Sequence, residues 1–493
     1  MGDGEFLRAI QVEAARAGYD GVQTWGVELA LDTYQTTVRD GLVDPERAIL
    51  GDFLAVRPFP VDVAIGNPPY VRLRHLPKED AARATAAAMR ALGSPMDPSG
   101  SVWMAFVLHA SEFLAPGGRL AFVLPHEMTH VRYARPVWRY LSQRFGSLRV
   151  VRVHERVFPE ILQDVILLFA DDRGGSTGEV EFEAYDCRTD LDFGRPVRQA
   201  RVEISRIVAG ERPFIEALLP VGLVDLLRGK VESATRPMRD IASLNIGYVA
   251  GDKRFFHPTD AMITQHQLPG ASLVPTVTSS RRMSGNGIWT AKLPKAATDR
   301  LFLPPVDAQA LTPGERAYIA IGQHAEVHRR YKCRIRDPWY VTPGVKVPNL
   351  LIPVFTDRPL LLINDGGYTA SNSMLSGYLT AGTAEAIAAA WYTSLTLLQV
   401  ELHVHSLGGG VMVFVPREAG AIRLAKAVTG RDHLQVVDQL LRAGNVDRAY
   451  QAGDAAVLSD HLGLSSREVD LIQEGVHSLR YWRAAPPRNP VTA

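Results

Sequence analysis

Helix-like and strand-like segments alternate along the first third of the chain. Helices are expected at residues 6–17, which are rich in alanine, at residues 32–41, and at residues 103–114, which have amphipathic spacing. Short apolar runs, which are typical of buried strands, occupy residues 21–29, 48–53, 61–66 and 119–124. We expect residues 150–153 and 165–169 to add antiparallel closing strands. This alternation predicts an α/β domain over residues 1–175, in which helices cover a mostly parallel sheet.

The character of the sequence changes after this domain. Residues 171–178 are polar and rich in glycine, and residues 176–234 mix strand-like and helix-like runs, so we interpret the latter as a connector. From residue 235 the apolar runs are short and interrupted by Gly, Pro and Asn, which predicts an irregular α+β domain over residues 235–493. Helical spacing returns in residues 421–482, so we expect this domain to end in helices.

Composition narrows the class of protein. The chain has 493 residues, of which 46% are hydrophobic and 22% charged, as in ordinary globular proteins of two or three domains. No apolar run reaches the roughly 20 residues of a membrane span. Cys187 and Cys333 are too few for a disulfide framework or a structural zinc site. We therefore expect a cytoplasmic protein with reduced cysteines, no metal and no membrane partner. The net charge of +1 is compatible with nucleic-acid binding, because a balanced total can hide a local basic face.

The tetrapeptide Asn67-Pro68-Pro69-Tyr70 directly follows an apolar run. Parallel sheets bind ligands beyond the carboxyl ends of their strands, which is where this loop is predicted to lie. The Asn67 side-chain oxygen and a proline carbonyl can each accept an N–H from an exocyclic base amine. These contacts localise the lone pair of the amine and stabilise the charge that develops during its alkylation. Tyr70 offers a face on which a base can stack, at about 1–3 kcal/mol, so Phe or Trp should replace it far better than Ala. The alternative is a turn that merely contains two prolines.

Three features before this loop suit a ligand that contains a nucleoside. Gly2 and Gly4 form a glycine loop that opens into a predicted helix, where a ligand can approach the backbone. Glu28 ends a predicted strand, where an acid can accept both hydroxyls of a ribose. Asp52 can accept from an adenine amino group, and Phe53 can cover the ring. Each feature is weak alone, since the glycine loop is equally compatible with a disordered start and Glu28 with a solvated strand end.

Basic and aromatic side chains are concentrated in residues 328–340, and two basic pairs precede them. This mixture suits the neutralisation of phosphates and contact with a nucleic-acid groove. The alternative is a solvated basic strand. The DNA-binding candidates are Lys253, Arg254, Arg281, Arg282, Arg329, Arg330, Lys332, Arg334, Arg336, Trp339 and Tyr340.

In the order of these motifs, residues 2–170 resemble the gamma class of DNA adenine-N6 methyltransferases, the TaqI-like and Eco57I-like group. The resemblance implies a Rossmann-like class I methyltransferase fold with S-adenosylmethionine as cofactor. It also implies transfer of the methyl group to N6 of an adenine flipped out of double-stranded DNA, without a covalent enzyme intermediate. On this resemblance Gly2 and Gly4 match the methionine side of the cofactor, Glu28 its ribose, and Asp52 and Phe53 its adenine.

The same resemblance implies further roles. Phe158 matches the aromatic residue that stacks on the other side of the flipped adenine, the alternative being an ordinary core Phe, and Asn67 borders both cofactor and base. Residues 235–493 resemble, less specifically, the target-recognition domain of the class, through residues 246–256, 336–340 and 407–410. Members of the class have a first strand ahead of the glycine loop, so we expect this chain to lack the usual start of the family.

Other functions compete with this one. Cytosine-C5 methylation needs a Pro-Cys nucleophile, and neither Cys187 nor Cys333 follows a proline. Similar loops methylate protein glutamines or ribosomal RNA, and a non-catalytic DNA-binding relic is the alternative outside the enzymes. The long C-terminal domain favours a site-specific DNA methyltransferase of a restriction-modification or phage-defence system. We expect a monomer that acts on double-stranded DNA, with a separate cognate restriction endonuclease as a candidate partner.

Overall fold

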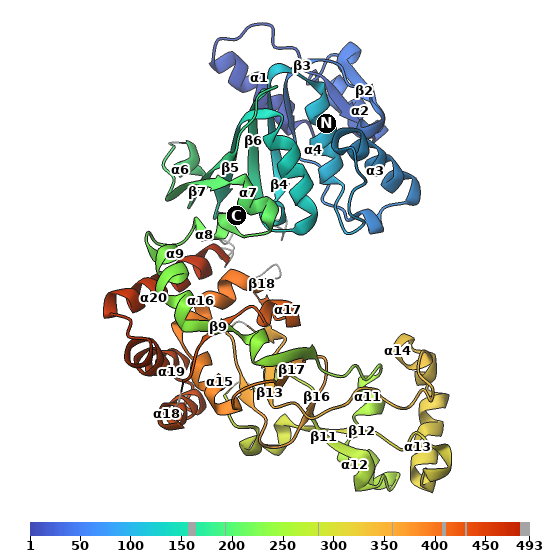
Figure 1. Ribbon diagram of the computed structural model, residues 1–493. Helices are drawn as coiled ribbons and strands as arrows, with labels where there is room; N and C mark the ends of the chain where they lie inside the picture. Colours follow the sequence, from blue (N-terminus) through green and yellow to red (C-terminus); the bar gives the residue numbers. More distant parts are fainter. Residues whose placement is uncertain are drawn as a thin grey trace, which may run out of the picture. The chain divides into compact units, whose positions relative to one another are not determined.

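The apolar runs of the first 170 residues form strands in the computed structural model (Figure 1). The structure describes residues 1–155, 164–192, 194–283, 285–356, 358–406, 411–428 and 431–483. β3 (Val61–Gly66) has the predicted bounds, because the prolines that follow Asn67 offer no backbone donor to a ladder. β1 (Gly26–Glu28) and β2 (Ala48–Leu50) are shorter than predicted. The longer strands are β4 (Leu114–Pro125), β5 (Phe145–Val153) and β6 (Val165–Arg173).

Six strands form one mixed sheet in the order β3-β4-β6-β5-β7-β8. β7 (Glu179–Tyr185) and β8 (Arg198–Glu203) extend it beyond the predicted strands. β3 is parallel to β4 and β5 to β7, whereas β6 is antiparallel to both β4 and β5, and β8 to β7. Of the two expected closing strands, β6 is therefore antiparallel to both of its neighbours, whereas β5 is antiparallel to β6 and parallel to β7. β1 and β2 pair in parallel in a separate two-stranded sheet.

Helices separate these strands, as the α/β prediction requires. They are α1 (Glu5–Arg16), α2 (Leu31–Arg39), α3 (Lys78–Leu92), α4 (Trp103–Phe113), α5 (Arg135–Ser142), α6 (Arg188–Asp192), α7 (Ile204–Ala209) and α8 (Pro213–Glu216). α4 was predicted to be amphipathic, but it is apolar on nearly all sides, because it packs against β3 and β4 with Trp103 and Leu108 fully buried. α5 is amphipathic instead, and it buries Val137 and Trp138.

Internal contacts divide the described residues into two units, Met1–Leu218 and the residues from Leu219 to Arg483. The first boundary lies later than the predicted residue 175, because β7 and β8 belong to the six-stranded sheet. The expected connector, residues 176–234, is thus divided between the two units. The glycine-rich run between β6 and β7 lies within the first unit.

The second unit begins with several small sheets and short helices, in agreement with the predicted irregular α+β domain. One sheet has the order β10-β17-β13-β15 and another the order β12-β11-β16. Their bounds are β10 (Ala242–Ile246), β11 (Leu273–Val277), β12 (Asp299–Phe302), β13 (Leu350–Pro353), β15 (Leu362–Ile363), β16 (Thr369–Ala370) and β17 (Met374–Leu379). The accompanying helices are α9 (Leu223–Leu226), α10 (Glu232–Ala234), α11 (Lys253–Phe256), α12 (Asp260–Gln265), α13 (Pro313–His324) and α14 (Tyr331–Arg334). Phe255, Phe256, Phe302 and Tyr318 form the centre of an aromatic core beneath α11 and α13.

The last part of the second unit is mainly helical, as its spacing predicted. Its helices are α15 (Ala384–Trp391), α16 (Ser394–His403), α17 (Pro416–Ala419), α18 (Arg431–Arg442), α19 (Val446–Gly453) and α20 (Ser466–Arg483). The remaining short strands are β9 (Thr235–Pro237), β14 (Phe355–Thr356), β18 (His405–Ser406), β19 (Met412–Val413) and β20 (Arg423–Ala425). In the part of the chain that the structure describes, no helix is long and apolar enough to cross a membrane.

Candidate active site

The loop Asn67-Pro68-Pro69-Tyr70 lies at the carboxyl end of β3, as predicted. Asn67 and Pro69 are exposed, Pro68 is buried and Tyr70 is half-buried. The Tyr70 hydroxyl lies 2.7 Å from Oδ1 of Asn67 and 3.0 Å from the carbonyl oxygen of Val123 in β4. Burial raises the pKa of Tyr70, so its hydroxyl keeps the proton that it can donate to either oxygen. The loop therefore presents an amide oxygen at the surface, with a tyrosine hydroxyl beside it.

Residues just after this loop fasten it to the rest of the unit. The Val71 carbonyl accepts hydrogen bonds from Ser101 Oγ at 3.0 Å and from Val102 N at 2.9 Å. Leu73 N donates to the Gly100 carbonyl at 3.0 Å. The chain on both sides of residue 72 is thus held by the segment that leads into α4, which limits how far the loop can shift.

Arg72 adds a second anchor, between the loop and the end of β4. Its guanidinium donates to Glu127 Oε2 at 2.7 Å and to the Ser99 carbonyl at 3.2 Å, and it also contacts the Tyr133 hydroxyl. Tyr133 in turn donates to the same Glu127 carboxylate. We call Arg72, Glu127 and Tyr133 the loop clamp. Sequence reasoning missed it, although an arginine two residues after Tyr70 and an acid two residues after the strand-ending Pro125 were visible signals.

The predicted nucleoside-binding residues come together at the carboxyl ends of β1 and β2. Glu28 Oε2 accepts from Gly2 N at 2.9 Å, and Oε1 accepts from Ala30 N at 3.0 Å. The amino group of Met1 lies 3.2 Å from the same carboxylate. Burial works against ionisation, but these hydrogen bonds together lower the pKa of Glu28. The glycine loop and the acid, which are 26 residues apart in the sequence, are therefore in direct contact.

The backbone around this acid fits the approach of a ligand. Gly2 and Gly4 have φ angles of +55° and +79°, the left-handed region that favours glycine, and Gly4 precedes the first residue of α1. Gly51 N donates to the Glu28 carbonyl at 2.8 Å, so the end of β2 lies beside the end of β1. A Cβ added to Gly2 or Gly51 would meet no atom within 4 Å, so both glycines border open space next to the acid.

Asp52 and Phe53 follow directly, but both already have partners. Asp52 Oδ1 accepts from Leu54 N at 3.0 Å, and Oδ2 accepts from Arg83 Nε at 2.8 Å. The Phe53 ring stacks on Phe106 and Phe113 of α4, with ring centres 5.3 and 5.6 Å apart. An acid and an aromatic ring beside a ribose-type acid fit a nucleoside, although a purine amine at Asp52 would share that carboxylate with Arg83. Phe158, the predicted second stacking residue, lies outside the described residues.

The predicted DNA-binding residues separate into three groups. Exposed basic side chains are Lys253, Arg254, Arg281, Lys332 and Arg334. Four arginines are bound to the protein itself: Arg282 to Asp299, Arg329 to Glu326, Arg330 to Asp252, and Arg336 to the carbonyl oxygens of Val249 and Ala250. Trp339 and Tyr340 pack in the aromatic core, where Tyr340 is buried. Residues 328–340 form the end of a 3-10 turn, then α14, then turns and bends, and not the basic strand that was the alternative.

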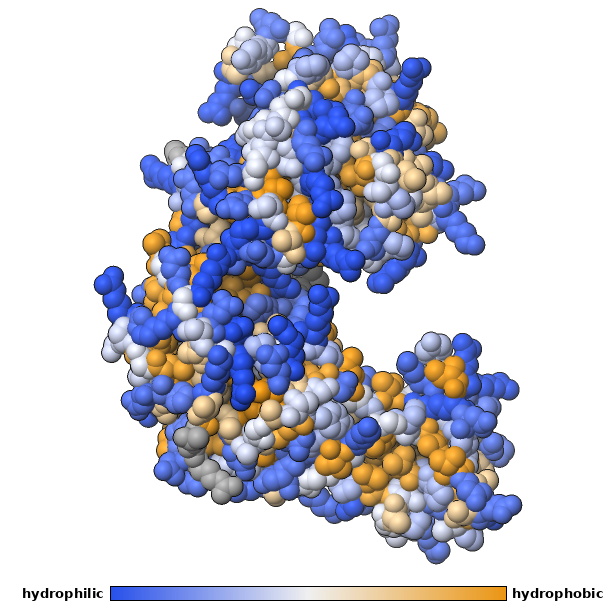
Figure 2. Space-filling view, in the orientation of Figure 1, coloured by the Kyte–Doolittle hydropathy of each residue, from blue (hydrophilic) through white to orange (hydrophobic). Residues whose placement is uncertain are grey.

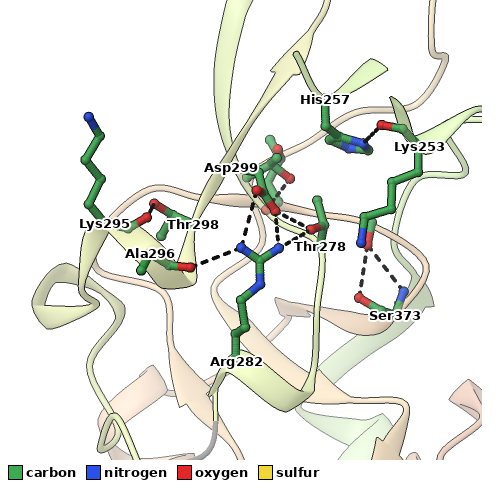
Figure 3. A network of polar contacts seen from close by, with 12 residues as sticks. Lys253, His257, Thr278, Arg282, Lys295, Ala296, Thr298, Asp299 and Ser373 are labelled. Carbon is green, nitrogen blue, oxygen red and sulfur yellow. Dashed lines mark hydrogen bonds and ion pairs between the residues drawn. The ribbon is translucent and has the colours of Figure 1, made fainter. Parts of the chain in front are cut away.

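Figure 3 shows the partners of the Arg282 guanidinium. Its guanidinium points at Asp299, with Nη2 2.5 Å from Oδ2, and it also donates to Thr278 Oγ1 at 2.9 Å and to the Ala296 carbonyl at 3.1 Å. These bonds join the segment after β11 to the start of β12. Arg282 therefore has a structural role in this unit, whereas Arg281 is exposed to solvent.

α14 combines charge with exposed apolar surface. Tyr331 and Ile335 are each 63% exposed. Lys332 and Arg334 lie over the Tyr331 ring, 5.3 and 5.5 Å from its centre. Figure 2 shows an apolar spot within hydrophilic surface in the region where Figure 1 places α14. Such a combination suits a nucleic-acid surface, where cations meet phosphates and a ring can meet a base or sugar.

Comparisons with known proteins support the same interpretation. The family model of the C-terminal domain of the type II methyltransferase M.Eco57I matches residues 211–458, which is half of the chain, and the Eco57I restriction-modification methylase model matches residues 59–158. The type II methyltransferase M.PaeR7I of Pseudomonas aeruginosa is 24% identical over 90% of this chain and 80% of its own length. M.AccI of Acinetobacter calcoaceticus is 22% identical over 64% of this chain and 58% of its own length.

A solved structure extends this similarity to the fold. The type IIL restriction-modification enzyme MmeI, solved in complex with DNA, matches with a TM-score of 0.53 and 12% identity. The match covers 94% of this chain and 67% of the MmeI chain. At that identity it supports a shared fold across both units and nothing finer. With a methyltransferase-type α/β unit and an Eco57I-type C-terminal domain in one polypeptide, this chain belongs to the Eco57I-like family of type II methyltransferases, the modification enzymes of restriction-modification systems.

Proposed function

We propose that this protein methylates N6 of adenine at specific sites in double-stranded DNA, with S-adenosylmethionine as the methyl donor. The observation that carries the proposal is the exposed Asn67 amide at the carboxyl end of β3, directly before two prolines and a half-buried tyrosine. S-adenosylmethionine supplies an electrophilic methyl group, and Gly2, Gly4 and Glu28 are the residues that would hold it, with Asp52, Phe53 and Asn67 bordering it.

The chain's own groups account for the activation of the amine. Asn67 Oδ1 and a proline carbonyl accept hydrogen bonds from the two N–H groups of adenine N6, so the nitrogen lone pair is withdrawn from the ring and directed at the methyl carbon. A new C–N bond then forms as the carbon–sulfur bond breaks, and the extra proton on N6 leaves to solvent. A base in a duplex cannot reach Asn67, so the adenine must be extruded, and the Tyr70 ring offers a stacking surface that offsets part of that cost. Phe158 remains the proposed partner on the other face.

The second unit is proposed to recognise the target site. The exposed cations Lys253, Arg254, Arg281, Lys332 and Arg334 are the proposed phosphate contacts. The backbone that carries those residues is supported by Arg282, Arg330 and Arg336. Arg329 forms an ion pair with Glu326. We place the activity in the cytoplasm, on DNA that a separate restriction endonuclease would otherwise cleave.

The decisive experiment replaces Asn67 with Ala. Methyl transfer from labelled cofactor to DNA should be abolished, while DNA affinity stays within about twofold, because the loss affects the reacting amine and not phosphate contacts. Asn445→Ala is the matched control, since Asn445 is exposed and its side chain makes no capping bond at the start of α19. Nucleoside analysis of the product identifies the methylated base. Normal turnover by Asn67→Ala, or a product other than N6-methyladenine, contradicts the proposal.

A further inference from the structure

The hydroxyl of Tyr70 has two acceptors and a single proton. Asn67 Oδ1 is 2.7 Å away, within the same loop, and the Val123 carbonyl oxygen is 3.0 Å away in β4. Both distances lie within the normal range for an O–H donor, with the shorter one to Asn67. A residue that serves only as a flat surface for a base needs neither contact, so stacking alone does not explain the position of this hydroxyl.

We propose that the Tyr70 hydroxyl is a positioning group that orients the Asn67 amide for the reacting amine; this inference rests on the proposed function. An exposed asparagine side chain rotates freely unless something holds it. A hydrogen bond from the hydroxyl to Oδ1 fixes the amide with its oxygen toward the tyrosine and leaves a second lone pair of that oxygen for an incoming N–H. Tyr70 thereby acts through Asn67, in addition to any stacking by its ring.

The Val123 carbonyl gives the Tyr70 hydroxyl a second acceptor. Once the base amine donates to Asn67 Oδ1, the hydroxyl can turn its proton to Val123 O without losing a partner. The amide oxygen is then free to accept the amine fully, just when the nitrogen needs its lone pair. Since β4 pairs on both sides, with β3 and β6, the backbone that carries the second acceptor is held in the sheet. The tyrosine backbone is held as well, through the contacts of Val71.

The test separates the hydroxyl from the ring. Tyr70→Phe keeps the stacking face and removes the hydroxyl. We expect the single-turnover rate of methyl transfer to fall about fivefold to tenfold, the usual effect of losing one neutral hydrogen bond. DNA affinity, cofactor affinity and the fluorescence of 2-aminopurine at the target position, which reports an extruded base, should match the wild type. Tyr140→Phe is the control, since it removes another hydrogen-bonded hydroxyl, which contacts Ser111 and Glu112 away from the loop.

Three results would overturn this inference. A Tyr70→Phe rate equal to that of the wild type and of Tyr140→Phe means that the ring alone matters. A weaker 2-aminopurine signal in Tyr70→Phe means that the hydroxyl acts in base extrusion and not through Asn67. A melting temperature of Tyr70→Phe below that of Tyr140→Phe, with a matching loss of activity, means that the role is general stability. Tyr70→Ala distinguishes the two levels of proposal: if it transfers normally, the proposed base-binding function fails, whereas an impaired Tyr70→Ala with a normal Tyr70→Phe rejects the positioning role alone.

Discussion

Replacing Arg72 with Met should destabilise the first unit, because Met keeps the length of the side chain and removes its donors. The guanidinium makes one ion pair with Glu127 and donates to the Ser99 carbonyl, and it contacts the Tyr133 hydroxyl. The Arg72 and Glu127 side chains are 34% and 18% exposed, so water replaces these contacts incompletely. Hydrogen bonds to charged groups contribute about 1.5–3 kcal/mol, and partial solvent screening leaves about 2 kcal/mol for this change.

The expected loss can be measured by thermal unfolding. For a unit of this size about 1 kcal/mol corresponds to 2–4 °C, so Arg72→Met should lower the melting temperature of the first unit by about 4–8 °C. Arg8→Met is the matched control, because Arg8 pairs with Glu5 on the surface of α1 with the two side chains 44% and 81% exposed. Such i,i+3 pairs contribute about 0.2–0.5 kcal/mol. Glu127→Gln and the double variant complete a cycle that isolates the coupling between the two charges.

The same change should slow methyl transfer. The clamp joins the segment after Tyr70 to the end of β4, and a shift of about 1 Å in a reacting group can reduce a rate by two orders of magnitude. We expect at least a tenfold loss at saturating DNA and cofactor. If Arg72→Met melts within the range of Arg8→Met, or shows no coupling with Glu127→Gln, the clamp does not hold the loop and the reasoning is wrong.

Three further predictions concern the cofactor end and the second unit. Gly4→Ala should weaken S-adenosylmethionine binding and lower stability, since φ is +79° and the new Cβ would lie 2.5 Å from Leu42; calorimetric titration and melting check both. Lys332→Ala and Arg334→Ala should each weaken DNA binding on all sequences and reduce the salt dependence of affinity by about one ion each, as measured by fluorescence anisotropy at several salt concentrations. Asp299→Asn should be less stable than wild type at neutral pH: burial opposes ionisation, but hydrogen bonds from Arg282 and Thr278 lower the pKa of Asp299. A lowered pKa gives stability that is present above the ordinary value of 3.8 and lost as pH falls through the folded value, so the difference between the two proteins should shrink in acid.

Local sequence patterns predicted a strand correctly where its boundaries are set by neighbouring residues. β3 was predicted residue by residue, because an apolar run ends at two prolines that cannot donate to a ladder. β1 was predicted too long: Gly21 has a φ of +90°, which is incompatible with a strand, and the Val22 and Trp25 side chains are exposed instead of buried in a sheet. β7 was interpreted as part of a connector, although glutamates alternate with apolar residues from Glu179 to Ala184, as is typical of a strand.

Local patterns predicted the residues of the candidate site better than the contacts between them. Glu28, Asp52 and Asn67 each lie at or directly after the end of a predicted strand, and this was enough to propose a ligand site, because parallel sheets bind ligands at the carboxyl ends of their strands. The pairing of Arg72 with Glu127 joins residues 55 positions apart, and no periodicity encodes such a contact. Likewise, the sequence does not distinguish Arg281 from the adjacent Arg282. Only the position of Asp299 in the fold gives Arg282 its structural role. Charge counts therefore predicted a basic region but not which of its cations are available to DNA.

The outer edge of β3 has a practical consequence for handling this protein. Within the described residues β3 pairs along one side only, with β4, and its Val63 and Ile65 side chains are 55% and 43% exposed. A strand edge that lies outside any ladder and carries exposed aliphatic side chains is a template on which other chains can pair. Concentrated solutions should accordingly form reversible aggregates that scatter light, more so at high salt. A single Val63→Lys change would be expected to improve solubility without touching the loop that follows Gly66.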